Sequence, residues 1–238
     1  LQGLYEDDGS ELNVKCYVLE MATQQKYLGK SYRAESAEVR RLAHKVADEI
    51  IEAVTGKKGI FSGRLLVVGN RTKNKEVYLC DPDGQNLVQL TRDGKISLSP
   101  KWGPDGKTIV YTSYLKGYPD VYSIDVGSGS RNRLSGFPGL NTGAEISPNG
   151  REVALILSKD GNPELYIMNL RSRELTRITR TPRAAEASPS WSPDGNQIVY
   201  VSDQPGTPQL YIVSRDGGAP VRVTGYNSEN VAPDWGAN

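Results

Sequence analysis

The sequence predicts a mainly β fold: a β-propeller of four-stranded blades, each about 44 residues long, preceded by part of a small α/β domain. Two observations carry this prediction. The chain after about residue 59 repeats with an offset of 44 or 45, which is the period of a propeller blade. The composition, with 25 Gly, 14 Pro and 13 Tyr but only 2 Phe, suits turns and short strands better than a helical bundle.

Three columns of residues keep this step along the chain. A bulky residue stands in a turn motif of the Trp-Ser-Pro-Asp-Gly type, a tyrosine follows further on, and an aliphatic residue with a hydroxyl residue after it closes the unit. The columns are Trp102, Ile146, Trp191 and Trp235; Tyr78, Tyr122, Tyr166 and Tyr211; and Leu90-Thr91, Leu134-Ser135, Ile178-Thr179 and Val223-Thr224. Columns in phase indicate one structural unit repeated along the chain.

Each repeat predicts four antiparallel strands. The turn motif leads into a nearly continuous apolar run, such as 108–111 or 197–201, which indicates a strand buried on both faces. A loop with Gly and Pro at fixed places, a Tyr-containing strand and an Arg-containing outer strand complete the unit. A propeller domain is therefore expected over 59–238, with blades at about 60–98, 99–143, 144–187 and 188–230.

The first blade has no turn-motif strand before its apolar run at 64–68. Residues 231–238 allow two explanations: they pair back as its innermost strand and close a ring of four, or they start a further blade. The alignment favours the second, because Gly236-Ala237-Asn238 matches Ser147-Pro148-Asn149. The four visible repeats would then belong to a longer propeller.

Residues 1–58 fall outside the repeat and predict the C-terminal part of an α/β domain. Apolar residues alternate over 12–18, which indicates a half-buried strand, and 25–33 is its expected hairpin partner. Ser36 as N-cap and Gly56 as stop predict a helix between them. Its expected apolar face is Val39, Leu42, Ala43, Val46, Ala47, Ile50 and Val54.

The strand order predicts which loops share a face of the propeller. The Pro-Asp-Gly turns lie on one face, with Asp105 and Asp194 as turn formers. The opposite face carries the loops inside the blades and the crossings between blades, and a partner would meet the mouth of the central channel there. The loops are 113–119, 157–163 and 202–208, and the crossings are 136–143, 180–187 and 225–231.

Charge and hydropathy exclude several partners. A net charge of +1 provides no global electrostatic field that would attract nucleic acid. The chain also contains no apolar run of about 18 residues, so direct membrane insertion is not expected. Cys16 and Cys80 are expected to stay reduced as small buried residues. The arginines between 171 and 183 are expected to protect sheet edges rather than bind phosphate.

No cofactor, metal or catalytic site is expected. The single histidine, His44, lies on the predicted helix without a nucleophile or ligand at helical spacing, so a structural role is expected. The segment Asp81-Pro82-Asp83-Gly84 lacks the further ligands of a calcium loop and predicts a β-turn. The chain contains no phosphate loop, Gly-x-Ser-x-Gly elbow or Cys-x-x-Cys motif.

These features resemble the TolB family. The resemblance rests on the helix-to-propeller junction and on the blade loops, in particular Arg40-Arg41-Leu42-Ala43-His44, Val54-Thr55-Gly56, Gly59-Ile60-Phe61 and Ser202-Asp203-Gln204-Pro205-Gly206. It implies a non-catalytic periplasmic protein of the Tol-Pal system with a six-bladed propeller. Such a protein binds the peptidoglycan-associated lipoprotein Pal at the propeller and TolA through an N-terminal segment. It supports outer-membrane integrity and constriction at cell division.

The resemblance also implies a partner-binding site. Six blades exceed the four visible here, and the TolA-binding segment has no counterpart, so the chain is expected to be an internal piece of such a protein. Carrying over the Pal-contacting crossing loops by motif gives Leu140, Asn141, Gly143, Glu186 and Ala187.

Two other functions stay open. One is the propeller of a prolyl-oligopeptidase-like serine hydrolase, which would need a hydrolase domain downstream. The other is a propeller that binds a small ligand or glycan, which would need aromatic residues at the channel mouth. The crossings 136–143 and 180–187 offer only Phe137.

Overall fold

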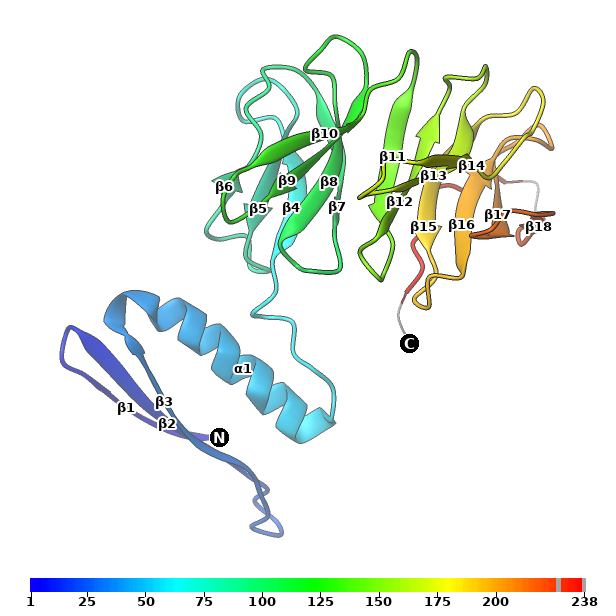
Figure 1. Cartoon of the computed structure of the whole chain (residues 1–238). Coiled ribbons are helices and arrows are strands. Elements are labelled where there is room, and N and C mark those ends of the chain that lie inside the picture. Colours follow the sequence, from blue (N-terminus) through cyan, green and yellow to red (C-terminus); the bar gives the residue numbers. More distant parts are fainter. Residues whose placement is uncertain (226–227, 237–238) are drawn as a thin grey trace. The chain divides into compact units, whose positions relative to one another are not determined.

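The computed structural model describes residues 1–225 and 228–236 (Figure 1). Tyr226 and Asn227 of the predicted crossing 225–231, and Ala237 and Asn238 of the predicted element 231–238, lie outside the described residues. The chain forms two compact units. The first comprises Leu1–Leu65 and Leu79–Val88, and the second comprises Leu66–Tyr78 and Gln89–Asn238.

The first unit contains an antiparallel sheet and one long helix. Strands β1 (Gln2–Asp7), β2 (Glu11–Leu19) and β3 (Lys26–Glu35) pair in that order, and helix α1 (Val39–Thr55) packs on them. The shared core is Leu12, Cys16, Tyr32 and Leu42. The predicted strand over 12–18 and its hairpin partner over 25–33 are confirmed.

Strand β1 has no counterpart in the sequence prediction. It pairs with β2 along its whole length, from Gln2 opposite Tyr17 to Asp7 opposite Leu12. Every residue of β1 is exposed. No position on this strand therefore requires an apolar side chain, and the sequence shows no alternation of apolar and polar residues. An edge strand is held by its backbone hydrogen bonds, and these leave no hydrophobic pattern to detect.

The predicted N-cap of α1 is wrong. Ser36 begins a short 3-10 helix, Ser36–Glu38, and Glu38 is the N-cap of α1. The Ser36 hydroxyl donates instead to Asp7 Oδ1 of β1 at 2.6 Å and lowers the pKa of that carboxyl. The predicted stop is confirmed, because Gly56 is left-handed (φ 72°) and its N–H donates to the Glu52 carbonyl.

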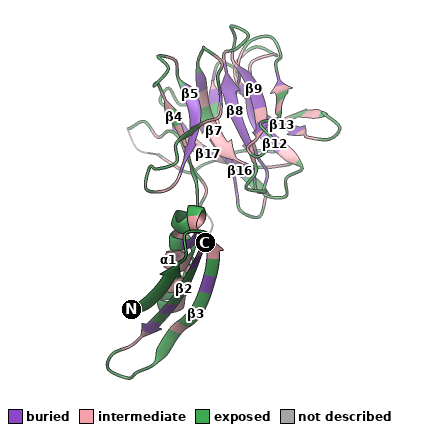
Figure 2. Ribbon diagram, turned by 90° about the vertical axis from the view of Figure 1, so that its left-hand side faces the viewer, coloured by how far each residue is buried: buried purple, intermediate pink, exposed green. Residues whose placement is uncertain are grey.

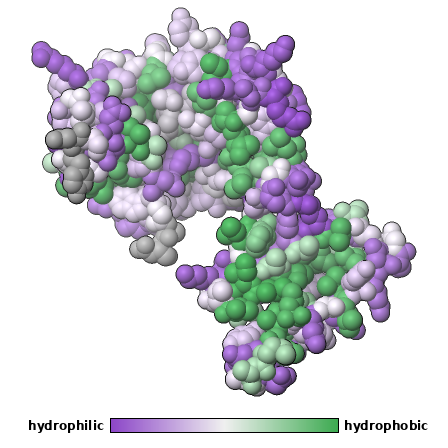
Figure 3. Space-filling view, turned by 180° about the vertical axis from the view of Figure 1, so that it is seen from behind, coloured by the Kyte–Doolittle hydropathy of each residue, from purple (hydrophilic) through white to green (hydrophobic). Residues whose placement is uncertain are grey.

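The apolar face of α1 is only partly covered within the first unit. Leu42 is buried and Val46 and Ile50 pack beside it, whereas Val39 and Val54 at the two ends are exposed. Figure 3 shows a broad apolar surface on the visible face of this unit. Neither α1 nor the 3-10 segment, among the described residues, is long and apolar enough to span a membrane.

The repeat forms successive antiparallel sheets whose strands pair in sequence order. One sheet has three strands, β4 (Leu65–Gly69), β5 (Glu76–Cys80) and β6 (Val88–Gln89). Three sheets have four strands. They are β7 (Ser97–Trp102), β8 (Thr108–Ser113), β9 (Asp120–Asp125) and β10 (Arg131–Ser135); β11 (Asn141–Ile146), β12 (Glu152–Leu157), β13 (Glu164–Asn169) and β14 (Leu175–Arg177); and β15 (Glu186–Trp191), β16 (Gln197–Ser202), β17 (Gln209–Ser214) and β18 (Val221–Arg222). The predicted propeller blades are thus confirmed as the repeating unit.

Neighbouring blades pack through apolar side chains of their middle strands, and Figure 2 colours many residues of these strands as buried. Val110 of β8 belongs to the same buried cluster as Ala144 and Leu155 of the next blade, and Ile156 belongs to the same cluster as Trp191 and Tyr200 of the blade after it. Three members of the bulky column and three of the tyrosine column lie in or against these cores: Trp102, Ile146, Trp191, Tyr122, Tyr166 and Tyr211. The sequence repeat therefore reflects the burial of these apolar side chains between neighbouring blades.

The Pro-Asp-Gly motifs form tight turns, as predicted. Asp105 Oδ1 accepts a hydrogen bond from the Thr108 N–H at 2.8 Å, and Asp194 Oδ1 accepts one from the Asn196 N–H at 3.0 Å. The two cysteines, Cys16 and Cys80, are free and buried, also as predicted.

Residues 231–236 form no strand with β4 in the described part of the chain. The Trp235 N–H donates to Ser190 Oγ of β15 at 3.2 Å, and Lys101 Nζ lies 2.7 Å from Asp234 Oδ1. The segment thus lies against β15. The start of a further blade stays a prediction.

Candidate partner-binding face and its polar hubs

The loops inside the blades lie against the crossings that follow them. Asn141 Nδ2 donates to the Pro119 carbonyl at 3.2 Å, and the Glu186 N–H donates to the Pro163 carbonyl at 2.9 Å. The Asn230 N–H donates to Pro208 O at 2.9 Å in the same way. The predicted sharing of one face by loops and crossings is confirmed. We call this surface, formed by 113–119, 136–143, 157–163, 180–187 and 202–208, the loop face.

A buried polar residue opens the third strand of each blade. These residues are Glu76, Asp120, Glu164 and Gln209, and each is at most 2% exposed. A threonine two residues after the last strand supplies a bonding partner: the Thr91 hydroxyl donates to Glu76, and the Thr224 hydroxyl donates to Gln209 Oε1 at 2.8 Å. We call each such residue, together with the groups that bond to it, a polar hub.

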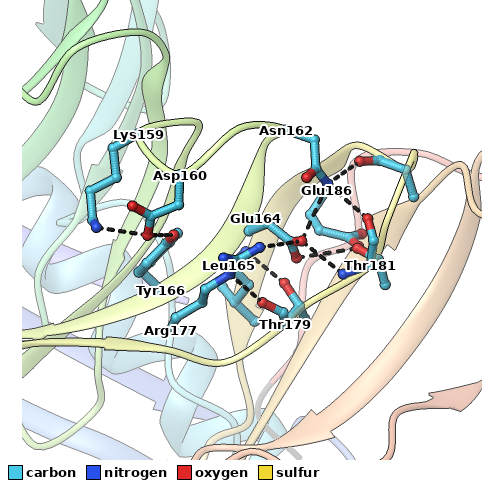
Figure 4. A network of polar contacts seen from close by, with 11 residues as sticks. Lys159, Asp160, Asn162, Glu164, Leu165, Tyr166, Arg177, Thr179, Thr181 and Glu186 are labelled. Atoms are coloured by element: carbon cyan, nitrogen blue, oxygen red, sulfur yellow. Dashed lines mark hydrogen bonds and ion pairs between the residues drawn. The ribbon is translucent and has the colours of Figure 1, made fainter.

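The hub of the third blade also binds the blade that follows (Figure 4). Glu164 accepts hydrogen bonds from Arg177 Nη2 at 2.8 Å and from the Thr181 N–H at 2.7 Å. The Thr181 hydroxyl lies 3.2 Å from Glu164 Oε2 and also contacts Glu186 Oε1. Because Glu186 begins β15, this hub joins β13 and the crossing 180–187 to the first strand of the next blade.

The two carboxyl groups of this hub differ in ionisation. Burial opposes the ionisation of Glu164, but hydrogen bonds from Thr179 and Arg177 lower its pKa. Burial raises the pKa of Glu186 to about 7, and the Glu164 charge adds to that shift. One Thr181 hydroxyl proton cannot serve two carboxylates, so a neutral Glu186 that donates to Thr181 Oγ1 fits the geometry.

We expect Glu186→Gln to stabilise the protein above neutral pH. The Glu186 pKa is about 7 in the folded protein, against an ordinary 4.5, so folding takes up a proton between these values. The free energy of unfolding therefore falls as the pH rises through that window, and the loss is complete above it. A pKa shift of this size corresponds to a loss of about 1–3 kcal/mol in the free energy of unfolding. Glutamine cannot ionise, so the variant avoids this loss.

Denaturant unfolding of wild type and Glu186→Gln at about pH 4 and about pH 8 checks this expectation. The variant should gain stability relative to wild type only at the higher pH. The same difference at both pH values would contradict the assignment of the raised pKa to Glu186.

Asn141 is fully buried and bonded at both polar side-chain atoms. Its Oδ1 accepts from Ser135 Oγ at 2.7 Å and from the Phe137 N–H at 2.9 Å. Its Nδ2 donates to the carbonyls of Pro119, Phe137 and Gly139 at 3.2, 2.8 and 3.2 Å. Asn141 therefore fixes the crossing to the loop before it and has no polar atom left for a partner.

The other residues proposed from the resemblance differ in exposure. Ala187 is exposed, Leu140 and Gly143 are half-buried, and Glu186 is buried. Leu140 packs against the core between the third and fourth blades. All five predicted residues lie on or beside the crossings. Asn141 and Glu186 are buried and hold the loop face in shape, whereas Leu140, Gly143 and Ala187 reach its surface. Their contact with a partner stays a prediction.

The first strands line a cavity of about 260 Å³. Each of β7, β11 and β15 carries a β-bulge, and the residue inside it is left-handed. The left-handed residues, with the equivalent residue of 231–236, are Ser99 (φ 51°), Gly143 (φ 63°), Ser188 (φ 49°) and Ala232 (φ 53°). Bulges re-aim side chains at barrel rims and beside binding sites, so this repeated strain shapes the cavity wall.

The outer-strand arginines do more than guard sheet edges. Arg177 bonds to the buried carboxylate of Glu164, and Arg133 Nη2 bonds to Asp120 Oδ1 at 2.9 Å. Arg177 therefore has a structural role that the expectation of edge protection did not include. The missed signal is a fourth column in the repeat, the acidic or amide residue two positions before each tyrosine.

His44 has a structural partner in the first unit. Its Nε2 lies 3.4 Å from Asp83 Oδ2, and Arg40 pairs with Asp81 and Asp83. The Gly84 N–H donates to the Asp81 carbonyl at 2.9 Å, so this segment forms the predicted β-turn. No group of three or more His, Cys, Asp or Glu side chains that could hold a metal ion occurs within 1–225 and 228–236.

Comparison with known proteins identifies the family. Residues 51–238 match the family profile described as the TolB beta propeller domain. The chain is 31% identical over 193 residues to the protein TolB homolog of Chlorobium chlorochromatii, covering 80% of this chain and 42% of that protein. It is 31% identical over 173 residues to the Tol-Pal system protein TolB of Desulfosudis oleivorans, covering 73% of this chain and 39% of that protein. The chain spans about two fifths of the length of these relatives.

Solved structures agree with this family. The crystal structure of TolB from Acinetobacter baumannii matches with a TM-score of 0.88 and 29% identity, covering 98% of this chain and 59% of that one. An oligogalacturonate lyase from Vibrio parahaemolyticus matches at a TM-score of 0.52 and 17% identity over 66% of this chain and 48% of the lyase, which shows a shared fold alone. The sequence repeat and the blades of this chain, together with the family profile and these relatives, show that the chain belongs to the TolB β-propeller family.

Proposed function

We propose that this chain is a non-catalytic periplasmic scaffold of the Tol-Pal system, and that its loop face binds the folded domain of a Pal-type lipoprotein. The observation that carries the proposal is the bonding of the crossings by buried side chains, above all the five hydrogen bonds of Asn141. The similarity to a Tol-Pal system protein TolB supports the class of partner. In this role the protein would support envelope integrity and constriction at division.

The physical basis of the proposed binding is a loop face that is ordered before the partner arrives. Loops that are already held lose little conformational freedom on association, so more of the contact energy appears as affinity. Leu140 and Ala187 offer apolar contact beside polar crossings, which matches the usual arrangement of an apolar centre with a polar surround. Covalent chemistry has no part in this function.

A calorimetric titration with the ectodomain of a Pal-type lipoprotein tests the proposal. We expect the double variant Leu140→Asp, Ala187→Asp to weaken binding by about a hundredfold or more, because two charges would be buried at the contact. The control, Asn149→Asp with Ser172→Asp, adds the same charges at exposed turns of the opposite face and should bind like wild type. Failure of the folded wild-type chain to bind, or equal binding by the double variant, would contradict the proposed site.

A further inference from the structure

A groove of about 370 Å³ opens on the loop face beside the second blade. It lies between the loop 113–119 and the crossing 136–143, and Lys116, Tyr118, Arg133 and Phe137 line it. The Tyr118 side chain is 73% exposed and the Phe137 side chain is 40% exposed. Two exposed aromatic side chains that line the same groove form an apolar surface that a partner could cover.

The equivalent place in the third blade is closed. Asn162 occupies the position of Tyr118 in the repeat, and its Nδ2 donates to the carbonyls of Thr181 at 2.8 Å and Ala184 at 2.6 Å. That amide bridges the loop to the crossing. Tyr118 forms no hydrogen bond with the described residues, so the same gap stays open in the second blade.

The crossing 136–143 also differs from the equivalent crossings of the first and third blades, at the position of Phe137. Asp93 in the first blade and Thr181 in the third occupy the position of Phe137 in the repeat, and both of these side chains are buried. Asp93 accepts hydrogen bonds from Arg131, and Thr181 bonds to the hub residue Glu164. Phe137 has no such bond to make, and its ring lines the groove instead. Two repeat positions thus change together, both toward an exposed aromatic ring.

The groove carries two cations, Lys116 and Arg133, and one carboxylate, Asp120, which pairs with Arg133 at 2.9 Å. Lys116 forms no ion pair within the described chain. Arg133 donates through Nη2 to Asp120 and to the Gly136 carbonyl at 3.0 Å, whereas its Nη1 and Nε make no hydrogen bond with the described residues. The Arg133 side chain is 46% exposed, so these donors can reach a ligand. Lys159 lies 5.8 Å from the centre of the Phe137 ring, but its charge is paired with Asp160 at 2.7 Å.

We propose that this groove binds an extended, acidic peptide segment of a partner protein. A carboxylate of the peptide would pair with Lys116 and with the unused N–H groups of Arg133, which suits the fork geometry of a guanidinium. An apolar side chain next to it would lie against the Tyr118 and Phe137 rings. The inference goes beyond the folded-domain contact proposed above, because Leu140, Gly143 and Ala187 do not line this groove.

Fluorescence anisotropy tests the proposal with the full chain and a fluorescein-labelled peptide of alternating glutamate and leucine around a central proline. We expect Lys116→Glu to weaken binding by about tenfold or more, since an attraction becomes a repulsion, and added salt to reduce the difference. Tyr118→Asn should weaken binding about as much, because it places in the second blade the side chain that closes the third. The matched glutamine peptide should bind about tenfold more weakly than the glutamate peptide.

The control is Lys107→Glu, which makes the same charge change at an exposed turn of the opposite face and should leave binding within about twofold of wild type. Unchanged thermal unfolding shows that each variant is folded. No binding by wild type, equal binding of the two peptides, or equal loss in the control and Lys116→Glu would overturn the proposal. The lipoprotein domain is titrated separately, so its failure to bind would leave the peptide result interpretable.

Discussion

Replacing Arg177 by methionine is expected to lower the free energy of unfolding by about 2–4 kcal/mol near neutral pH. Arg177 is the cation that faces the buried Glu164 carboxylate, at 2.8 Å, and Glu186 lies in the same hub. Methionine keeps much of the volume but leaves an uncompensated buried charge, which is the costly way to break an ion pair. Denaturant unfolding measures the loss.

Two comparisons make this result specific. Arg173→Met removes an exposed arginine from the same blade and should change stability by less than about 1 kcal/mol. Among the described residues, its guanidinium donates only to the carbonyls of Arg133 and Leu134. Adding Glu164→Gln to Arg177→Met should restore part of the loss, because the buried charge is then absent. Equal losses for the two arginine variants would show that Glu164 does not depend on Arg177.

Asn141→Ala is expected to lower the free energy of unfolding by about 3 kcal/mol. The substitution leaves the Ser135 hydroxyl, the Phe137 N–H and three carbonyl oxygens without the partner they have in a fully buried site. Each unsatisfied buried group contributes about 1–3 kcal/mol, and local relaxation recovers part of the sum. Asn149→Ala, in an exposed turn, is the matched control and should change stability by less than about 1 kcal/mol.

Hydrogen exchange locates the effect. The Phe137 amide donates to Asn141 Oδ1, so its exchange should speed up in Asn141→Ala more than that of amides in the opposite turns. If Asn141→Ala is destabilised but the Phe137 amide does not exchange faster, the loss of stability does not arise in the crossing and the prediction is wrong.

The propeller repeat could be predicted because burial between blades recurs at fixed spacing. Tyr122, Tyr166 and Tyr211 occupy equivalent strands, and their shared environment appears in the sequence as a column. The N-cap of α1 could not be predicted in this way. Ser36 has two possible partners, and the one it uses, Asp7, is distant in sequence and lies on a strand without an apolar pattern.

The candidate site shows the same limit. The resemblance led to residues on the crossings, whose contact with a partner stays a prediction, and it could not tell that Asn141 and Glu186 are buried. Their burial depends on atoms from other segments, the Pro119 carbonyl for one and the Thr181 hydroxyl for the other. The ion pair of Arg177 with Glu164 was detectable, since both residues recur in the repeat with the same spacing, although the chemistry of that pairing becomes evident only in the folded chain.

The hubs that join one blade to the next have a consequence for biosynthesis. Glu164 shares its hub with Glu186, and Gln209 accepts from Asn230 Nδ2 at 3.3 Å, so each of these blades is completed by a residue that follows its own last strand. A chain that emerges N-terminus first, from the ribosome or from an export channel, cannot bury such a hub until the opening of the next blade has also emerged. Folding of the propeller should therefore trail the emergence of the chain by about one strand, with each new blade closing the one before it.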